Sequence, residues 1–197
     1  MLHLIVIAGP SGGGKSTHAE GLMTRSDGRR LSFATYLKEA ALESGWSGLK
    51  DEAGRRYLQD FGFLMKKNYG DDIFARKLIE NAEVLIRAGV TTIIVDDHRF
   101  AVEFSALKAW EKKAKRSRCV TFVKFCDTKA ENIWRKDFLQ CKPWALHLSE
   151  LEWRAFPDDA WDVIFHNDRI NGVDNSIERL VTQINWVIET KNKRMKL

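Results

Sequence analysis

Apolar runs alternate with amphipathic segments along this chain of 197 residues. Five short runs are rich in apolar, largely β-branched or aromatic, side chains and predict strands at about residues 2–8, 31–33, 90–95, 119–125 and 161–167. Between them, the spacing of apolar positions predicts helices at about 15–25, 35–44, 51–67, 72–88, 101–114 and 175–192. Strands that alternate with helices favour an α/β fold, with a parallel sheet covered on both faces.

The length fits a single domain, residues 1–197, with no repeat or linker. One long stretch, about residues 126–158, has no clear strand or helix period and holds Pro143 and Pro157. We interpret it as an irregular, lid-like insertion over the edge of the sheet where ligands bind.

A glycine-rich motif follows the first predicted strand at once. It reads G-P-S-G-G-G-K-S-T and matches the phosphate-binding pattern G-x-x-x-x-G-K-[ST] in full. Backbone N–H groups of such a loop turn toward phosphates, and the next helix adds partial positive charge. Lys15 is expected to reach the β and γ phosphates, and Ser16 to offer its hydroxyl to Mg²⁺. The motif therefore predicts binding of ATP with Mg²⁺ through Gly9, Ser11, Gly12, Gly13, Gly14, Lys15, Ser16 and Thr17.

Composition and charge limit the setting of the protein. No apolar run approaches the ~20 residues of a membrane span, and we expect neither a membrane partner nor a cleaved leader. Cys119, Cys126 and Cys141 form no C-x-x-C pair, which favours a reducing, cytoplasmic location and argues against zinc. The net charge is +5, and a basic stretch covers residues 106–118. That stretch fits a solvated helix end, or else a surface that meets nucleic acid.

The third predicted strand ends in Asp96-Asp97-His98-Arg99. An acid at the end of an apolar strand beside a phosphate loop is the usual second anchor for Mg²⁺. Two adjacent acids cannot both point the same way, so one is expected to face the metal and the other a neighbour. Our first assignment for the metal is Asp97 with Ser16, and Asp96 is the alternative; either acid could instead cap a helix. Arg99 is placed to hold a phosphate through paired hydrogen bonds.

Two further segments supply candidate acceptor residues. Lys38 and Glu39 come just after the second predicted strand, near the expected acceptor site. Arg56, Gln59 and Asp60 share a helix face, where an arginine could bind phosphate and a glutamine could contact a base edge. From spacing alone, a solvated helix face is the simpler interpretation of these three.

Together these motifs resemble the phage deoxynucleoside monophosphate kinases of the phosphate-loop kinase superfamily. The matching pieces, which cover most of the chain in order, are the phosphate loop, F-A-T-Y-L-K-E-A, R-R-Y-L-Q-D-F-G, D-D-H-R, H-L-S-E and W-D-V-I-F-H-N-D. The resemblance implies the three-layer P-loop NTPase fold of nucleoside monophosphate kinases, with a five-stranded parallel sheet. It also implies acceptor or catalytic roles for Lys38, Arg56, Gln59, Asp97 and Arg99.

The chain departs from that family at two places. His98 stands where a small residue is expected, and the region 126–146 is longer than in the relatives. That region holds Trp134 and Arg135, and basic lids in nucleotide kinases close over the phosphates. We therefore take Arg135 as the candidate lid arginine.

Three functions fit these residues. The first is a deoxynucleoside monophosphate kinase, whose acceptor oxygen is already anionic and needs no general base. The second resembles phage enzymes that phosphorylate 5-hydroxymethyluracil in DNA, where Asp96, Asp97 or Glu39 would act as base. Its support is the basic charge and four tryptophans, which could stack on bases or pack in the core: Trp134, Trp144, Trp153 and Trp161. The third is an ATPase or nucleotide switch without an acceptor. A phage origin would place the protein in the host cytoplasm; the sequence leaves its oligomeric state and preferred base open.

Overall fold

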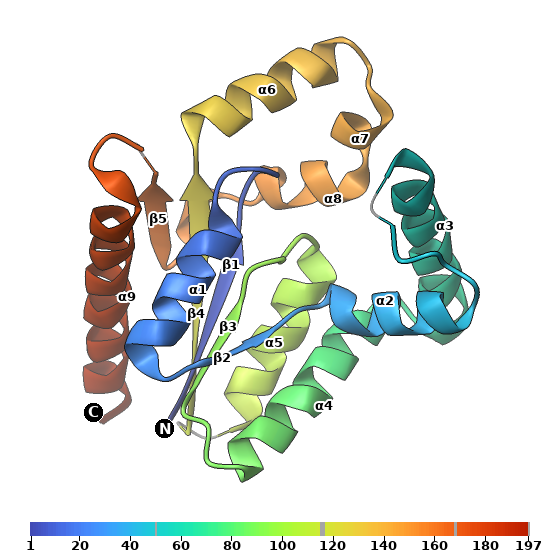
Figure 1. Ribbon diagram of the computed structural model, residues 1–197. Helices are drawn as coiled ribbons and strands as arrows, with labels where there is room; N and C mark the ends of the chain where they lie inside the picture. The colour runs from blue at the N-terminus through green and yellow to red at the C-terminus, as the bar shows by residue number, and fades with distance from the viewer. Residues whose placement is uncertain (50, 115–116, 168, 197) are drawn as a thin grey trace.

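The computed structural model describes residues 1–49, 51–114, 117–167 and 169–196. Its strands are β1 (Leu2–Ala8), β2 (Arg29–Leu31), β3 (Thr92–Val95), β4 (Arg118–Cys126) and β5 (Val163–His166). They form one parallel sheet in the order β2-β3-β1-β4-β5 (Figure 1). The prediction of a five-stranded parallel sheet is confirmed, and the carboxyl ends of all its strands meet at one edge.

Helices cover both faces of this sheet. The longer ones are α1 (Lys15–Ser26), α2 (Ala34–Glu43), α3 (Glu52–Tyr69), α4 (Ile73–Arg87), α5 (Ala101–Lys113), α6 (Thr128–Leu139) and α9 (Gly172–Lys196). Alternate residues of β1 point to opposite faces, as a strand requires. Leu4 and Val6 pack in the layer that contains α4 and α5, and Ile5 and Ile7 pack in the layer that contains α1 and α9.

Two helices lie beyond the carboxyl edge of the sheet. After β2 the chain turns into α2 and then α3. Helix α3 stands apart from the sheet, opposite α6 and the two short helices that follow it, α7 (Pro143–Leu146) and α8 (Leu148–Leu151) (Figure 1). Gly62 of α3 packs against Leu37 of α2, so this face of α3 is directed inward. A cavity lies between these two segments at the carboxyl edge of the sheet.

The prediction of an irregular segment at 126–158 is wrong. The structure has α6, the short helices α7 (Pro143–Leu146) and α8 (Leu148–Leu151), and 3-10 turns at Glu152–Ala155 and Asp158–Ala160. Asp127 caps α6 by accepting a hydrogen bond from the backbone N–H of Ala130. Periodicity missed α6 because its apolar side chains do not form a buried stripe: Ile133 and Leu139 are exposed, and Ala130 is buried.

The second strand begins earlier than expected, at Arg29 instead of residue 31. It is a short edge strand whose residues are exposed or half-buried, so no apolar run marks it. Its pairing with β3 places Arg30 opposite Ile94, close to the end of that strand.

The basic stretch lies at the amino edge of the sheet, where α5 ends and β4 begins, opposite the phosphate loop. Lys108 pairs with Glu111, and Arg118 pairs with Glu83 while its guanidinium lies over the ring of Trp110. Lys115 and Arg116 of this stretch lie outside the described residues. In the described part of the chain, no helix is long and apolar enough to cross a membrane.

Leu180→Ala is expected to lower the free energy of unfolding by about 2–5 kcal/mol, because Leu180 of α9 is fully buried and its loss leaves a cavity against the sheet. Urea denaturation measures the change. Trp186→Ala on the same helix is the control, since that side chain is 68% exposed and its loss should cost within ~0.5 kcal/mol. Equal losses in both variants would contradict the placement of α9.

Candidate functional site

The phosphate loop joins β1 to α1 as the motif predicts. Gly12 and Gly14 have φ angles of 73° and 94°, which side chains rarely adopt. Gly9 lies against β4, where an added Cβ would collide with the carbonyl oxygen of Phe125. The loop therefore needs glycine at these positions for its curvature and for its close packing on the sheet.

Lys15 is folded back over its own loop. Its Nζ donates hydrogen bonds to the carbonyl oxygens of Gly9 and Pro10, at 2.9 and 2.8 Å. Burial, and to a lesser extent the positive charge of Arg99, lower the pKa of Lys15 to about 7. The carboxylates of Glu150, Asp96 and Asp97 raise the pKa of Lys15. These three acids and Arg99 therefore all lie near the Lys15 ammonium group.

Asp96 ties the loop to the neighbouring strands. Its Oδ2 accepts a hydrogen bond of 2.7 Å from the hydroxyl of Ser16. Arg30 of β2 binds both oxygens of the same carboxylate, with Nε to Oδ1 at 2.8 Å and Nη2 to Oδ2 at 2.6 Å. A hydroxyl beside a carboxylate suits Mg²⁺, which is held by a few oxygen ligands, substrate phosphates and water. Sequence analysis did not single out Arg30, because two adjacent arginines on an exposed strand carry no motif.

Asp97 points away from Ser16. Its carboxylate accepts hydrogen bonds from the Ser32 hydroxyl at 2.6 Å and from the backbone N–H groups of Phe33 and Ala34 at 3.0 Å each. It thus caps the start of α2, and burial raises its pKa. The structure places Asp96 at Ser16, where sequence analysis first placed Asp97. The two carboxylates point in different directions, and a metal role for either of them stays a prediction.

Arg99 follows two residues later and is held by the segment after α7. Its Nη1 lies 2.6 Å from Oε1 of Glu150, a buried carboxylate at the end of the H-L-S-E motif. Arg154 also pairs with Glu150, and its guanidinium lies over the rings of Trp134 and Trp153. Glu150 therefore links the end of β3 to the α6 segment.

His98 and Glu103 hold the backbone between these groups. His98 is fully buried among aromatic rings, and its Nδ1 lies 3.1 Å from Oε2 of Glu103. The same carboxylate oxygen accepts hydrogen bonds from the backbone N–H groups of Arg99 and Phe100. His98 stands where the sequence analysis expected a small residue, and it packs in the core.

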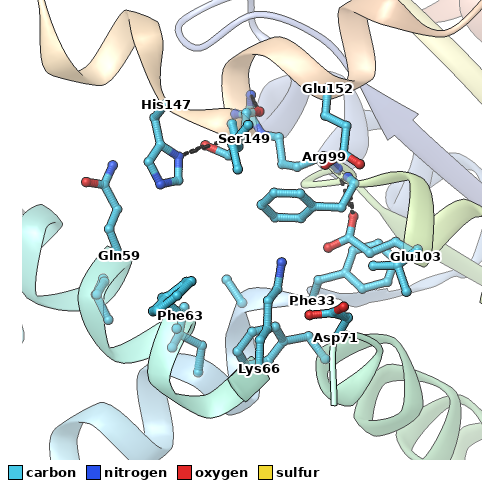
Figure 2. A pocket seen from close by; sticks show the side chains of 18 of the residues that line it. Phe33, Gln59, Phe63, Lys66, Asp71, Arg99, Glu103, His147, Ser149 and Glu152 are labelled. Carbon is cyan, nitrogen blue, oxygen red and sulfur yellow. Dashed lines mark hydrogen bonds between the residues drawn. The ribbon is translucent and has the colours of Figure 1, made fainter. Parts of the chain in front are cut away.

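A cavity of about 760 Å³ opens between α2, α3 and the β3–α5 turn, with the His147–Glu152 segment as its other wall (Figure 2). Its surface is largely apolar and includes Phe33, Leu37, Phe63, Phe74, Phe100 and Leu148. Polar groups enter it from several elements and include Gln59, Lys66, Asp97, Arg99, His147 and Glu152. A planar ring with polar substituents fits such a lining.

Three predicted acceptor residues do not line this cavity. Of the described residues on its surface, none is Lys38, Glu39 or Arg56. The Arg56 side chain is 84% exposed and lies 4.0 Å from Asp60 on the outer side of α3. Gln59 does reach the cavity. Acceptor contacts for Lys38, Glu39 and Arg56 therefore stay predictions that this arrangement of the chain does not display.

Of the four tryptophans considered for base stacking, two lie in the core and two lie on α6 and α7. Trp153 and Trp161 are buried, so they are not available to stack on bases. Trp134 packs on Arg154, and Trp144 donates a hydrogen bond to Asp137. Arg135 is exposed on α6, and its role in a closing lid stays a prediction.

A polar network behind the phosphate loop was missed by the sequence analysis. Arg169 binds both oxygens of the buried Asp127 and the carbonyl oxygen of Gly12. Asn167 donates to the carbonyl oxygen of Gly13 and to Asp127. The V-I-F-H-N-D motif therefore supports the loop through Asn167, while its last residue, Asp168, lies outside the described residues.

Comparisons with known proteins support the fold. No protein-family model and no curated protein matches the sequence. Among solved structures, a "putative kinase" from Chloroflexus aurantiacus is 17% identical, with 92% of this chain and 94% of that chain aligned at a TM-score of 0.52. TT1252 from Thermus thermophilus is 18% identical, with 93% and 96% aligned at a TM-score of 0.51. These likenesses show the fold alone: a three-layer α/β fold with a parallel sheet, in which the phosphate loop follows the first strand.

Binding of ATP with Mg²⁺ at pH 8 is expected to take up close to one proton. Lys15 with a pKa of about 7 is mostly neutral at pH 8, and phosphates raise that pKa when they bind. Calorimetry in two buffers of different ionisation enthalpy measures the uptake. Lys15→Arg is the control, because arginine stays charged and takes up no proton at this position. Equal heats in both buffers for the unaltered protein would contradict the lowered pKa.

Proposed function

We propose that this chain transfers the γ-phosphoryl group of ATP to a deoxynucleotide acceptor in the 760 Å³ cavity, and that the acceptor is a deoxynucleoside monophosphate. The observation that carries the proposal is the position of Arg99. Arg99 lines the cavity, and its charge acts on Lys15 of the phosphate loop. A phosphate bound at the loop and an acceptor bound in the cavity would meet beside this arginine.

The donor side of the site has the groups that phosphoryl transfer needs. Backbone N–H groups of the loop and the start of α1 surround the phosphates, and Lys15 moves from its carbonyl partners to them. Ser16 and Asp96 are the residues that would hold Mg²⁺, which neutralises charge on the transferred group. Lys15 and Arg99 would spread the remaining negative charge as the bond to the leaving phosphate breaks.

The acceptor side favours a phosphate oxygen over a hydroxyl. A monophosphate oxygen is anionic at pH 7 and needs no general base. Asp97, one of the acids that line the cavity, accepts three hydrogen bonds that fix the start of α2, which suits a structural role. The phenylalanine side chains of the cavity offer flat apolar surface to a base.

A second candidate is phosphoryl transfer to the hydroxyl of 5-hydroxymethyluracil in DNA. The observation that favours it is Asp97 itself, a cavity carboxylate whose pKa burial raises toward that of a useful base. The structure weakens two of the sequence features that supported a DNA acceptor. Trp153 and Trp161 are core residues, and the basic stretch of α5 lies at the opposite edge of the sheet.

An acceptor panel separates these functions. The protein is incubated with γ-labelled ATP, Mg²⁺ and one of three acceptors: deoxynucleoside monophosphates, plain DNA, or DNA that contains hydroxymethyl pyrimidines. Label is expected on the free monophosphates, because their anionic oxygen needs no base. Label on modified DNA alone would overturn the first proposal in favour of the second. Release of inorganic phosphate with every acceptor, and transfer to none, would indicate an ATPase.

Lys15→Ala is expected to lower phosphoryl transfer about 10³-fold or more, because it removes the cation that stabilises charge on the transferred group. The fold should persist, since the variant removes a buried charge whose hydrogen bonds, among the described residues, go to the carbonyl oxygens of Gly9 and Pro10 alone. Circular dichroism and thermal melting measure the fold beside the activity. A folded Lys15→Ala variant with unchanged activity would contradict the assignment of the site.

A further inference from the structure

Lys66, which no sequence motif singles out, enters the cavity from α3. Gln59, Phe63 and Lys66 recur at helical spacing and share the face of α3 that lines the cavity. Arg56 and Asp60 pair with each other outside it. Figure 2 shows the Lys66 side chain rising into the cavity, with Arg99 and His147 across from it.

The ammonium group of Lys66 lies against an aromatic ring. Its Nζ lies 3.6 Å from the centroid of the Phe100 ring. Among the described residues, no carboxylate lies within ion-pair distance of it. Arg99, by contrast, is already paired with Glu150 at 2.6 Å. An ammonium held over a ring in a largely apolar cavity is partly desolvated, and an anionic ligand would compensate it.

His147 adds a hydrogen-bond donor to the same space. Its Nδ1 accepts a hydrogen bond of 3.2 Å from the backbone N–H of Ser149, so the proton of the neutral ring is on Nε2. Burial lowers the pKa of His147; the carboxylate of Glu150 acts in the opposite direction, and the charges of Lys66 and Arg99 act in the same direction as burial. The three groups come from three different segments of the cavity wall, and the charges of Lys66 and Arg99 both act on His147.

We propose that Lys66 binds the phosphate group of the nucleotide acceptor, with His147 Nε2 as a second donor. The inference rests on the proposed function and names the anchor of its substrate. The phosphate could belong to a free monophosphate or to the backbone of a DNA strand, since both present the same anionic oxygens. In either case Lys66 replaces Arg56 as the cation of α3 that contacts the acceptor.

Lys66→Met tests the proposal against Lys77→Met. Lys77→Met removes the same charge, and Lys77 also lies near an aromatic ring, that of Tyr36. Lys77 is paired with Glu80 on α4, however, and it does not line the cavity. Lys66→Met is expected to raise the KM for the acceptor about 10- to 100-fold and to leave the KM for ATP unchanged, because a charged hydrogen bond to phosphate is lost. Lys66→Arg should recover part of the loss.

Acetylation of lysines, read by mass spectrometry, tests binding without catalysis. In the absence of ATP, a deoxynucleoside monophosphate should protect Lys66 and leave Lys77 reactive, and the matching nucleoside without phosphate should protect neither. Protection of Lys66 by hydroxymethylated DNA alone would keep Lys66 as the phosphate anchor and overturn the monophosphate acceptor.

The opposite pattern would overturn the role of Lys66. Equal protection by nucleoside and nucleotide, or the same acceptor KM in Lys66→Met and Lys77→Met, contradicts a phosphate contact. Either result would still leave the proposed function open to the acceptor panel, because another residue could bind the phosphate of a monophosphate acceptor.

Discussion

The carboxylate of Asp96 joins three segments that are far apart in the sequence. It binds the hydroxyl of Ser16 at the start of α1 and the guanidinium of Arg30 on β2, and it follows the end of β3 directly. A buried carboxylate is costly unless its oxygens are paired and hydrogen-bonded, so this contact strongly favours one relative position of loop, helix and edge strand. The donor site is assembled around that constraint.

Three further carboxylates hold segments of the chain in position near the cavity. Asp97 holds the start of α2, Glu103 holds the backbone at Arg99 and Phe100, and Glu150 holds the Arg99 side chain. Each acid fixes a segment that lies at the carboxyl edge of the sheet. The proposed acceptor site therefore has walls of apolar side chains whose backbones are positioned by ionic and hydrogen-bonded contacts.

Local sequence patterns predict much of this protein, because they record interactions between near neighbours. The phosphate loop, the five strands and the edge at which they end depend on such patterns. The directions of the Asp96 and Asp97 side chains do not follow from local patterns. They are determined by Arg30 on β2, which binds Asp96, and by Ser32 in the turn after β2, which binds Asp97. The position of Lys66 could not be predicted from local sequence for the same reason. Helix α3 carries charged residues on several faces, and the packing of Gly62 on Leu37 determines which face turns inward.

The contact of Lys15 with the carbonyl oxygens of Gly9 and Pro10 has a consequence for turnover. Those oxygens occupy the ammonium while no phosphate is present, so the loop competes internally with its own ligand. In the proposed function, entry of a nucleotide would break these hydrogen bonds and departure of a product would restore them. Such an exchange would weaken ground-state affinity and would favour release of the product.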